Sequence, residues 1–286
     1  MLMDGKKIAK EIKEEIKAEI DRIREQYKIF PEVALIMVGK DPASEVYINS
    51  QINLCKTLGI EARVFFFENN ITEQLLLDLI EDLNNSPTTD GIMLNLPLPK
   101  HMNVTKILNN IKLEKDVDGF KAENLGLLFQ NDSNFIAPST PAGIMEMLKR
   151  YKIDLTGKDV VVVGRSNIVG KPVAALVLNA HGTVTICNSY TKNLQEKTRN
   201  ADILISAVGK PEFIKADMVK EGAVVIDVGI NKIGNKIVGD IDFENVKDKV
   251  SHITPVPGGI GTLTVAMLFS NILKAFKKNR SILEEE

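Results

Sequence analysis

The first 28 residues place apolar side chains at a helical spacing. Isoleucines recur every three or four positions among lysines and glutamates: Ile8, Ile12, Ile16, Ile20 and Ile23. This pattern predicts a helix over residues 4–28 with one apolar face that packs on a core. Pro31 ends the pattern, because proline cannot continue a helix.

Short apolar runs and helical patterns then alternate along the chain. Residues 33–38 (VALIMV) are apolar throughout, which predicts a strand that is buried on both faces. Further strands are predicted at residues 62–67 and 91–96, with helices between them at 42–58 and 72–83. Strands that alternate with helices indicate a parallel sheet covered by helices.

The same alternation restarts after a proline-containing connection at residues 136–143. Helices are predicted at 141–151, 172–180 and 264–278, strands at 160–163, 184–187, 203–208 and 224–229, and a loop-rich segment at 253–264. The fold class is therefore α/β, with two α/β domains over residues 1–138 and 139–264. A C-terminal helix within residues 265–286 is expected to pack back on the first domain.

Charge and composition exclude several classes of protein. The 286 residues include 36 Lys and Arg against 38 Asp and Glu, so no basic field attracts nucleic acid or an anionic membrane. No apolar run is expected to span a bilayer. Two cysteines cannot form a disulfide framework, and both lie in apolar segments typical of buried thiols. The charged N-terminus does not resemble a signal peptide, so we expect a cytoplasmic protein.

Residues 164–172 (GRSNIVGKP) follow a predicted buried strand and open a helix, which indicates a nucleotide site. Gly164 permits a sharp turn, and Gly170 permits close packing of helix and strand. The helix N-terminus would offer free N–H groups to a phosphate. Ser166 replaces the middle glycine of the usual GxGxxG, and a plain strand–turn–helix without a ligand is the alternative.

The end of the next strand indicates which dinucleotide fits. NAD sites often carry an acidic residue there for the ribose 2′-hydroxyl, but residues 187–193 (CNSYTKN) contain none. Arg165 and Ser189 are instead available to a 2′-phosphate, which favours NADP over NAD. NAD stays possible, because Arg165 could equally be a solvated surface residue.

Six segments, taken together and in order, resemble one enzyme family. They are DPASEVY (41–47), NLPLPKH (95–101), KDVDGF (115–120), GRSNIVGKP (164–172), DVGI (227–230) and TPVPGGIGTLT (254–264). Over residues 4–277 the chain is similar to the methylenetetrahydrofolate dehydrogenase/methenyltetrahydrofolate cyclohydrolase family of the bacterial FolD type. The resemblance implies a homodimer whose two domains enclose a cleft. NADP would lie on the second, Rossmann-type domain, and a one-carbon tetrahydrofolate derivative in the cleft.

The resemblance also implies roles for individual residues. Tyr47 would position the folate, and Asp118 would bind its pterin-like ring; a half-buried packing tyrosine and an Asp-Gly turn are the alternatives. The NADP site would be lined by Gly164, Arg165, Ser166, Ser189 and Ile230, and the cleft would be edged by Pro257, Gly258 and Gly259. The three histidines show no metal-ligand spacing, so neither a metal nor a catalytic histidine is expected.

Four positions depart from the family pattern. Gln51 replaces the usual lysine, Asn95 a glutamine, Thr262 a proline and Ser139 a cysteine; Gln51 and Asn95 complete the expected catalytic set with Tyr47 and Asp118. The family oxidises 5,10-methylene- to 5,10-methenyltetrahydrofolate and then hydrolyses it to 10-formyltetrahydrofolate. Hydride transfer removes no proton, whereas hydrolysis needs a group that exchanges protons, which an amide cannot do.

Gln51 therefore predicts an NADP-dependent dehydrogenase whose cyclohydrolase activity is weak or lost, because losing an acid–base group costs about 10²–10⁴-fold. Lys56 lies about 140° around the helix from Gln51 and is badly placed to substitute. The alternatives are a fully bifunctional enzyme and a non-catalytic folate- or NADP-binding paralogue. A third alternative is a dehydrogenase of another family, such as a shikimate-type enzyme. The segments KDVDGF and LPLP argue against this alternative.

Overall fold

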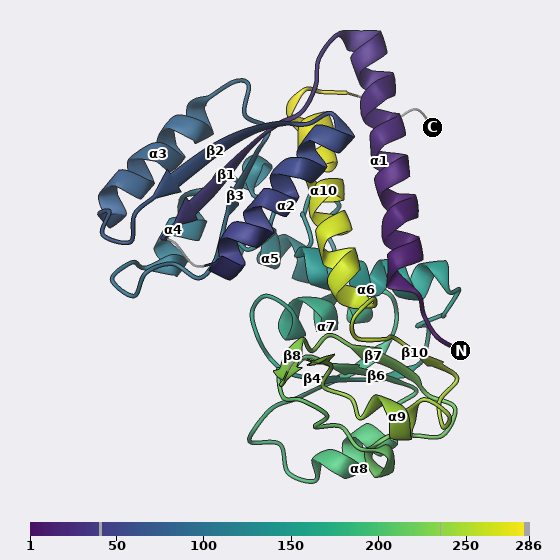
Figure 1. Cartoon of the computed structure of the whole chain (residues 1–286). Helices are drawn as coiled ribbons and strands as arrows, with labels where there is room; N and C mark the ends of the chain where they lie inside the picture. Colours follow the sequence, from purple (N-terminus) through teal and green to yellow (C-terminus); the bar gives the residue numbers. More distant parts are fainter. Residues whose placement is uncertain (40–41, 235, 283–286) are drawn as a thin grey trace. The chain divides into compact units, whose positions relative to one another are not determined.

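The structure is a computed structural model that describes residues 1–39, 42–234 and 236–282, without the side chains of residues 42–47. The chain divides into two compact units (Figure 1). The first unit comprises Ile12–Leu125 and Leu268–Glu286, and the second comprises Met1–Glu11 and Gly126–Met267. The bounds of these units do not coincide with the predicted domain bounds, residues 1–138 and 139–264, which stay a prediction.

A three-stranded parallel sheet forms the first unit, with the strand order β2-β1-β3. Its strands are β1 (Glu32–Val38), β2 (Glu61–Phe67) and β3 (Gly91–Leu94). Its helices are α2 (Pro42–Leu58), α3 (Glu73–Asn85), α4 (Val104–Asn110) and the short η1 (Leu113–Lys115), and α5 (Ala122–Phe129) runs into the second unit. Every residue of β1 is buried, which confirms the prediction of a strand covered on both faces.

Apolar side chains of α3 and α4 form one core with the sheet. The core joins Ala34 and Ile36 of β1 to Leu76 and Ile80 of α3 and to Ile107 of α4. Thr72 begins α3 as predicted, because its hydroxyl accepts the Leu75 N–H at 3.2 Å. The helix α4 was not predicted, since its seven residues are too few to show an apolar period.

Two long helices begin in the second unit and end in the first. They are α1 (Gly5–Tyr27) and α10 (Ile260–Asn279). The predicted isoleucine stripe of α1 is confirmed, since its five members are 0–5% exposed. By length and composition alone α10 could span a membrane, contrary to the expectation that no run could. Half of that stretch is buried inside the protein, and Phe269 and Phe276 are core residues.

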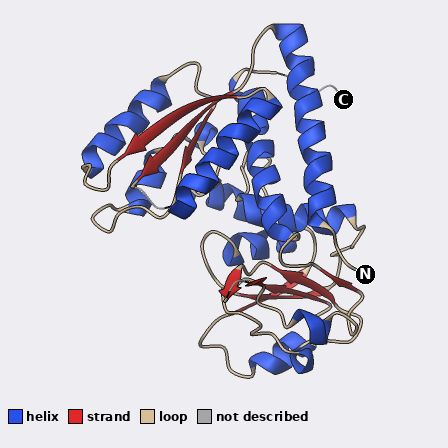
Figure 2. Cartoon of the chain, viewed as in Figure 1, coloured by secondary structure: helices blue, strands red, loops and turns tan. Residues whose placement is uncertain are grey.

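A parallel sheet forms the core of the second unit (Figure 2). It has five strands in the order β10-β7-β6-β4-β5. Its strands are β4 (Asp159–Val163), β5 (Thr183–Cys187), β6 (Ile203–Ser206), β7 (Val224–Asp227) and β10 (His252–Ile253), and β8 (Asn231–Ile233) and β9 (Lys236–Val238) form a separate hairpin. Its helices are α6 (Ser139–Arg150), α7 (Gly170–Asn179), α8 (Leu194–Arg199), η2 (Ala216–Met218) and α9 (Phe243–Val246). The four predicted strands are confirmed.

The strand order reverses direction at β4, because β5 lies on one side of it and β6 on the other. In sheets of this kind ligands bind outside the carboxyl ends of the strands at such a switch point. The loops after β4, β5 and β6 are therefore the place to look for a nucleotide.

Candidate active site

A cavity of about 390 Å³ lies at this switch point. It is lined by residues that follow the three strands, including Gly164, Arg165, Asn188, Ser189, Val208 and Lys210. Three of the predicted cofactor residues, Gly164, Arg165 and Ser189, thus come together at one cavity. Ile230 is not among its lining residues, and Ser166 lies in the adjoining turn.

Two glycines allow the backbone to fold tightly beside this cavity. Gly164 has φ +130°, and a Cβ on it would stand 2.4 Å from the Ala207 carbonyl oxygen. A Cβ on Gly170 would stand 2.2 Å from the Gly164 carbonyl oxygen. Both distances are far shorter than real contacts. A larger residue at 164 would push away the loop after β6, and one at 170 would force α7 away from the turn after β4.

Ser166 uses the first N–H groups of α7. Its hydroxyl accepts the N–H groups of Val169 and Gly170 at 3.1 and 3.4 Å, and its carbonyl accepts the Lys171 N–H at 3.0 Å. The next residue is Pro172, which has no N–H. The prediction that the first turn of α7 offers free N–H groups to a phosphate is therefore wrong, and Ser166 shapes the turn instead.

Cationic and hydroxyl side chains at the cavity suit a phosphorylated dinucleotide. The Arg165 guanidinium lies 5.6 Å from the centre of the Tyr190 ring, a cation–π contact that orients it. Lys210 supplies a second cation to the lining, which the sequence analysis missed. Its position in the loop that follows the buried strand β6 was the signal that could have found it. The residues present thus fit a ligand that carries several phosphates.

A buried carboxylate holds the loop that presents Lys210. Asp240 is fully buried and accepts the N–H groups of Val208, Gly209 and Lys210 at 2.7, 3.2 and 3.0 Å. Asp227, in the DVGI segment, accepts the N–H groups of Gly229, Asp240 and Ile241. Burial, aided by the charge of Asp240, raises the pKa of Asp227 to about 6 against the effect of these hydrogen bonds.

In the first unit, a second buried carboxylate organises the KDVDGF segment. Asp116 is 1% exposed and accepts the N–H groups of Gly119, Phe120 and Lys121 at 3.1, 3.3 and 2.8 Å, and the Asn124 Nδ2–H at 2.7 Å. Gly119 has φ +71°. The sequence left open that Asp118 serves only to form an Asp-Gly turn. In the structure, Asp116 rather than Asp118 accepts the N–H groups of that turn.

Asp118 is half-buried, and its acidity is strongly altered. Burial of the carboxyl, followed by the negative charge of Asp116, raises the pKa of Asp118 to about 8, although a backbone hydrogen bond from Leu94 acts in the opposite direction. A carboxyl whose pKa is raised this far, in a loop beside the last residue of β3, is typical of a functional site.

The remaining predicted catalytic residues lie on α2 and after β3. Gln51 is 1% exposed, and neither polar atom of its amide has a hydrogen-bond partner among the described residues. An unpaired buried amide costs ~1–3 kcal/mol, so Gln51 is suited to pair with a ligand. Asn95 is also buried, and its N–H donates to the Ile36 carbonyl at 2.9 Å. The Tyr47 side chain lies outside the described residues.

The predicted cleft-edging glycines pack on the start of α1. The Gly258 carbonyl accepts the Gly5 N–H at 2.9 Å, and a Cβ on Gly5 would stand 2.3 Å from the Gly259 carbonyl oxygen. The helix α10 starts at Ile260 rather than at 264, so the last five residues of the segment predicted to be loop-rich, 253–264, are helical. Thr262 stands in its first turn and donates to the Gly259 carbonyl at 2.7 Å.

No cluster of three potential metal ligands occurs within the described residues. Both cysteines are buried and free. Burial raises the pKa of the Cys55 thiol to about 12, so this cysteine is not a nucleophile at neutral pH.

Two models of one family match this chain. The catalytic-domain model, described as tetrahydrofolate dehydrogenase/cyclohydrolase, matches residues 3–118, and the NAD(P)-binding-domain model matches residues 138–280. The chain belongs to the tetrahydrofolate dehydrogenase/cyclohydrolase family. The bifunctional protein FolD of Fusobacterium nucleatum is 67% identical over 283 residues, which cover 99% of this chain and 100% of that protein.

Solved structures of other members share the fold. The bifunctional FolD methylenetetrahydrofolate dehydrogenase/cyclohydrolase of Campylobacter jejuni is 46% identical, with a TM-score of 0.95 over 97% of this chain and 99% of that one. The Trypanosoma brucei enzyme, complexed with NADP and an inhibitor, is 34% identical, with a TM-score of 0.93 over 99% of both chains.

These similarities confirm the predicted family and the two α/β domains, and they identify the chain as a nicotinamide-dependent enzyme of tetrahydrofolate metabolism. The cavity at the switch point is the candidate site for its dinucleotide. The prediction that the hydrolytic activity is weak or lost has less support, because the Fusobacterium and Campylobacter relatives are described as bifunctional.

We predict that Arg165→Ala raises the KM for NADP about 10-fold or more and changes the KM for NAD less than 2-fold, because only NADP carries the 2′-phosphate. Initial-rate kinetics with each cofactor measure this. Lys171→Ala is the matched control, since that ammonium donates to Asn167 at 2.7 Å and is not part of the cavity lining. Equal losses with both cofactors would contradict the assignment.

We also predict a pH limb that belongs to Asp118. Below about pH 8 its carboxyl is protonated and cannot accept two N–H bonds, so kcat/KM for the folate should rise as the pH rises through about 8. The measurement is a pH profile at saturating NADP for the wild type and Asp118→Asn. The limb should disappear in Asp118→Asn and persist in the control Asp82→Asn, which alters an exposed carboxylate of α3.

Proposed function

We propose that the chain oxidises 5,10-methylenetetrahydrofolate to 5,10-methenyltetrahydrofolate with NADP, and hydrolyses this product to 10-formyltetrahydrofolate. The observation that carries the proposal is the switch-point cavity with Arg165, Ser189 and Lys210, which suits NADP, in a chain of this family. The bifunctional relatives support both reactions.

For the oxidation, bound NADP supplies the acceptor for a hydride from the methylene carbon of the folate. The products are the methenyl cation and NADPH, and no proton leaves the folate in this step. The protein therefore needs to hold and orient its two ligands. Arg165, Ser189 and Lys210 would bind the dinucleotide, and Asp118, as a carboxylate, would accept two N–H bonds from the pterin-like ring.

Hydrolysis makes a stronger demand on the protein. Water adds to the methenyl carbon and loses a proton, one carbon–nitrogen bond breaks, and the released nitrogen gains a proton. Gln51 can orient a water molecule but cannot exchange a proton with it. Among the predicted catalytic residues, Asp118, whose pKa is raised to about 8, and Tyr47 carry groups that can.

Gln51 also favours a second candidate function, a dehydrogenase whose cyclohydrolase activity is weak or lost. One pair of assays separates the two candidates: NADPH formation from methylenetetrahydrofolate, and hydrolysis of methenyltetrahydrofolate above the rate in buffer. Enzymatic hydrolysis supports the bifunctional enzyme, and hydrolysis at the buffer rate supports the second candidate. A protein that binds both ligands but forms no NADPH would be the non-catalytic paralogue.

We predict that Gln51→Lys raises the hydrolysis rate about 10²–10⁴-fold, because a lysine supplies the missing proton carrier. The dehydrogenase rate should change less than 10-fold, since hydride transfer needs no proton exchange. Gln51→Met is the control, because it removes the amide without adding an amine. A rise in both variants, or in neither, would show that proton exchange at this position does not limit hydrolysis.

We further propose that the chain is a cytoplasmic homodimer joined through β5. The free buried thiols suit a reducing compartment. β5 is the outer strand of its sheet, pairs with β4, and exposes Thr185 and Ile186. A two-fold axis would pair two such edges antiparallel and cover them.

We predict that Ile186→Lys converts a dimer to a monomer, because two like charges would then face each other across the axis. Light scattering after gel filtration measures the mass. Ile237→Lys is the control, since this residue is also exposed but lies on the β8–β9 hairpin. A monomeric wild type, or a dimer that survives Ile186→Lys, would contradict the proposal.

A further inference from the structure

Two asparagines of α10 contact the segment that leads into Asp118. The Asn271 Nδ2 donates to the Val117 carbonyl at 2.9 Å in a buried contact. About two turns further on, the Asn279 Nδ2 donates to the Glu114 and Asp90 carbonyls, both at 3.0 Å. The C-terminal helix is thus joined by hydrogen bonds to both ends of residues 114–117.

Asn271 is 6% exposed on a helix whose neighbouring side chains are core residues such as Ile272 and Ala275. A buried amide is costly unless it is hydrogen-bonded. An apolar side chain at this position would serve packing equally well. The amide therefore points to a specific task, and the Val117 carbonyl is the group that it binds.

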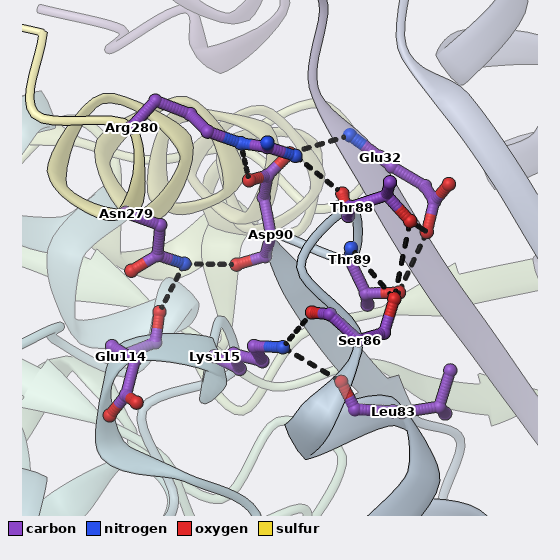
Figure 3. A network of polar contacts seen from close by, with 10 residues as sticks. All are labelled: Glu32, Leu83, Ser86, Thr88, Thr89, Asp90, Glu114, Lys115, Asn279 and Arg280. Carbon is purple, nitrogen blue, oxygen red and sulfur yellow. Dashed lines mark hydrogen bonds and ion pairs between the residues drawn. The ribbon is translucent and has the colours of Figure 1, made fainter.

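The last turn of α10 supports the same segment from a second side (Figure 3). Arg280 donates through Nε to the Asp90 carboxylate and through Nη2 to the Thr88 carbonyl, both at 2.8 Å. Asn279 links Asp90 to Glu114 beside it, as Figure 3 shows. Lys115 extends toward the end of α3 and donates to the Leu83 and Ser86 carbonyls, both at 2.7 Å.

The residues directly around Asp118 leave little freedom for its backbone. Val117 is buried against β3, where a Cβ on Gly91 would come within 2.5 Å of a Val117 methyl carbon. Asp116 pairs with Ile92 in a parallel bridge, and its carboxylate holds the N–H groups of the following turn. Asp118 lies between these two fixed parts, one residue after the carbonyl that Asn271 binds.

We propose that Asn271 is a positioning residue for folate recognition, which fixes Asp118 by holding the Val117 carbonyl, with Asn279 supporting the same segment. This inference rests on the proposed role of Asp118 in binding the pterin-like ring. Two parallel hydrogen bonds to one carboxylate require a defined orientation of the carboxylate plane. If the backbone at Val117 could rotate, the Asp118 carboxylate would keep its charge but lose this defined orientation.

The test compares wild type with Asn271→Leu, which has a similar volume but no donor. The KM for methylenetetrahydrofolate should rise about 3- to 10-fold, the effect of one lost hydrogen bond. The KM for NADP should change less than 2-fold, because its cavity lies in the other unit. Gln74→Leu is the control, since it also removes an amide donor in the same unit, one that bonds only the exposed Asp78 carboxylate one turn along α3, at 2.7 Å.

A double-mutant cycle shows whether Asn271 acts through Asp118. The Kd for tetrahydrofolate is measured by calorimetry for wild type, Asn271→Leu, Asp118→Ala and the double variant. The 3- to 10-fold effect of Asn271→Leu should vanish when Asp118 is already alanine. An effect that persists there would overturn the proposal, because Asn271 would then act on the folate by another route.

If Asn271→Leu does not fold, the milder Asn279→Ala carries the test, with an expected rise of about 2- to 3-fold in the folate KM and no change for NADP. An unchanged folate KM in the folded variants, with a wild type that reduces NADP, would overturn this inference alone. A wild type that forms no NADPH from methylenetetrahydrofolate would instead contradict the proposed function.

Discussion

Buried parallel strands bring the functional loops of this protein to the carboxyl edges of its two sheets. β1 and most of β4 are buried on both faces, so these strands themselves cannot present polar side chains to a ligand. Polar residues become accessible only in the loops that follow the strands. The switch-point cavity opens after β4, β5 and β6, and Asn95 directly follows β3. Asp118 is held near the end of β3 by the bridge between Asp116 and Ile92 of that strand.

Loops at such an edge need fixed shapes, and buried carboxylates give them these shapes. Asp240 holds the loop that presents Lys210, and Asp116 holds the turn around Asp118. Each carboxylate accepts several N–H groups, which compensates for its removal from water. The charge of Asp116 also acts at a distance, because it helps to raise the pKa of its neighbour Asp118. Asp116 therefore holds the shape of the loop and adds to the effect of burial on the pKa of Asp118.

The periodic elements were predictable because their signals are local. The isoleucine stripe of α1 and the apolar run of β1 each reflect burial on a repeating geometry. The start of α10 was not predictable, because the three glycines and two threonines of residues 258–264 resemble a loop. The helix accommodates both threonines, because Thr262 and Thr264 donate their hydroxyls to the Gly259 and Ile260 carbonyls of the preceding turn.

The site was predictable only where its residues stand together in the sequence. Gly164 and Arg165 belong to one motif, and the structure places both at the cavity. Asp240 holds a loop 30 residues away, and Asn271 contacts Val117 across 154 residues. No spacing rule reveals such pairs, because the tertiary fold alone brings them into contact. The role of Ser166 could not be predicted from the sequence either, since the hydroxyl of a serine in that turn can bind a phosphate or accept N–H groups at the start of the helix.

Gln51 shows how binding and proton exchange can be separated at one position. A lysine and a glutamine are both costly to bury without a partner, and either one gains when a polar ligand arrives. The amide of Gln51, unpaired among the described residues, can therefore keep the binding function of a family lysine. It cannot change its charge, so any proton that hydrolysis moves must pass to another group. Among the predicted catalytic residues, Asp118 is the one whose pKa burial raises, to about 8.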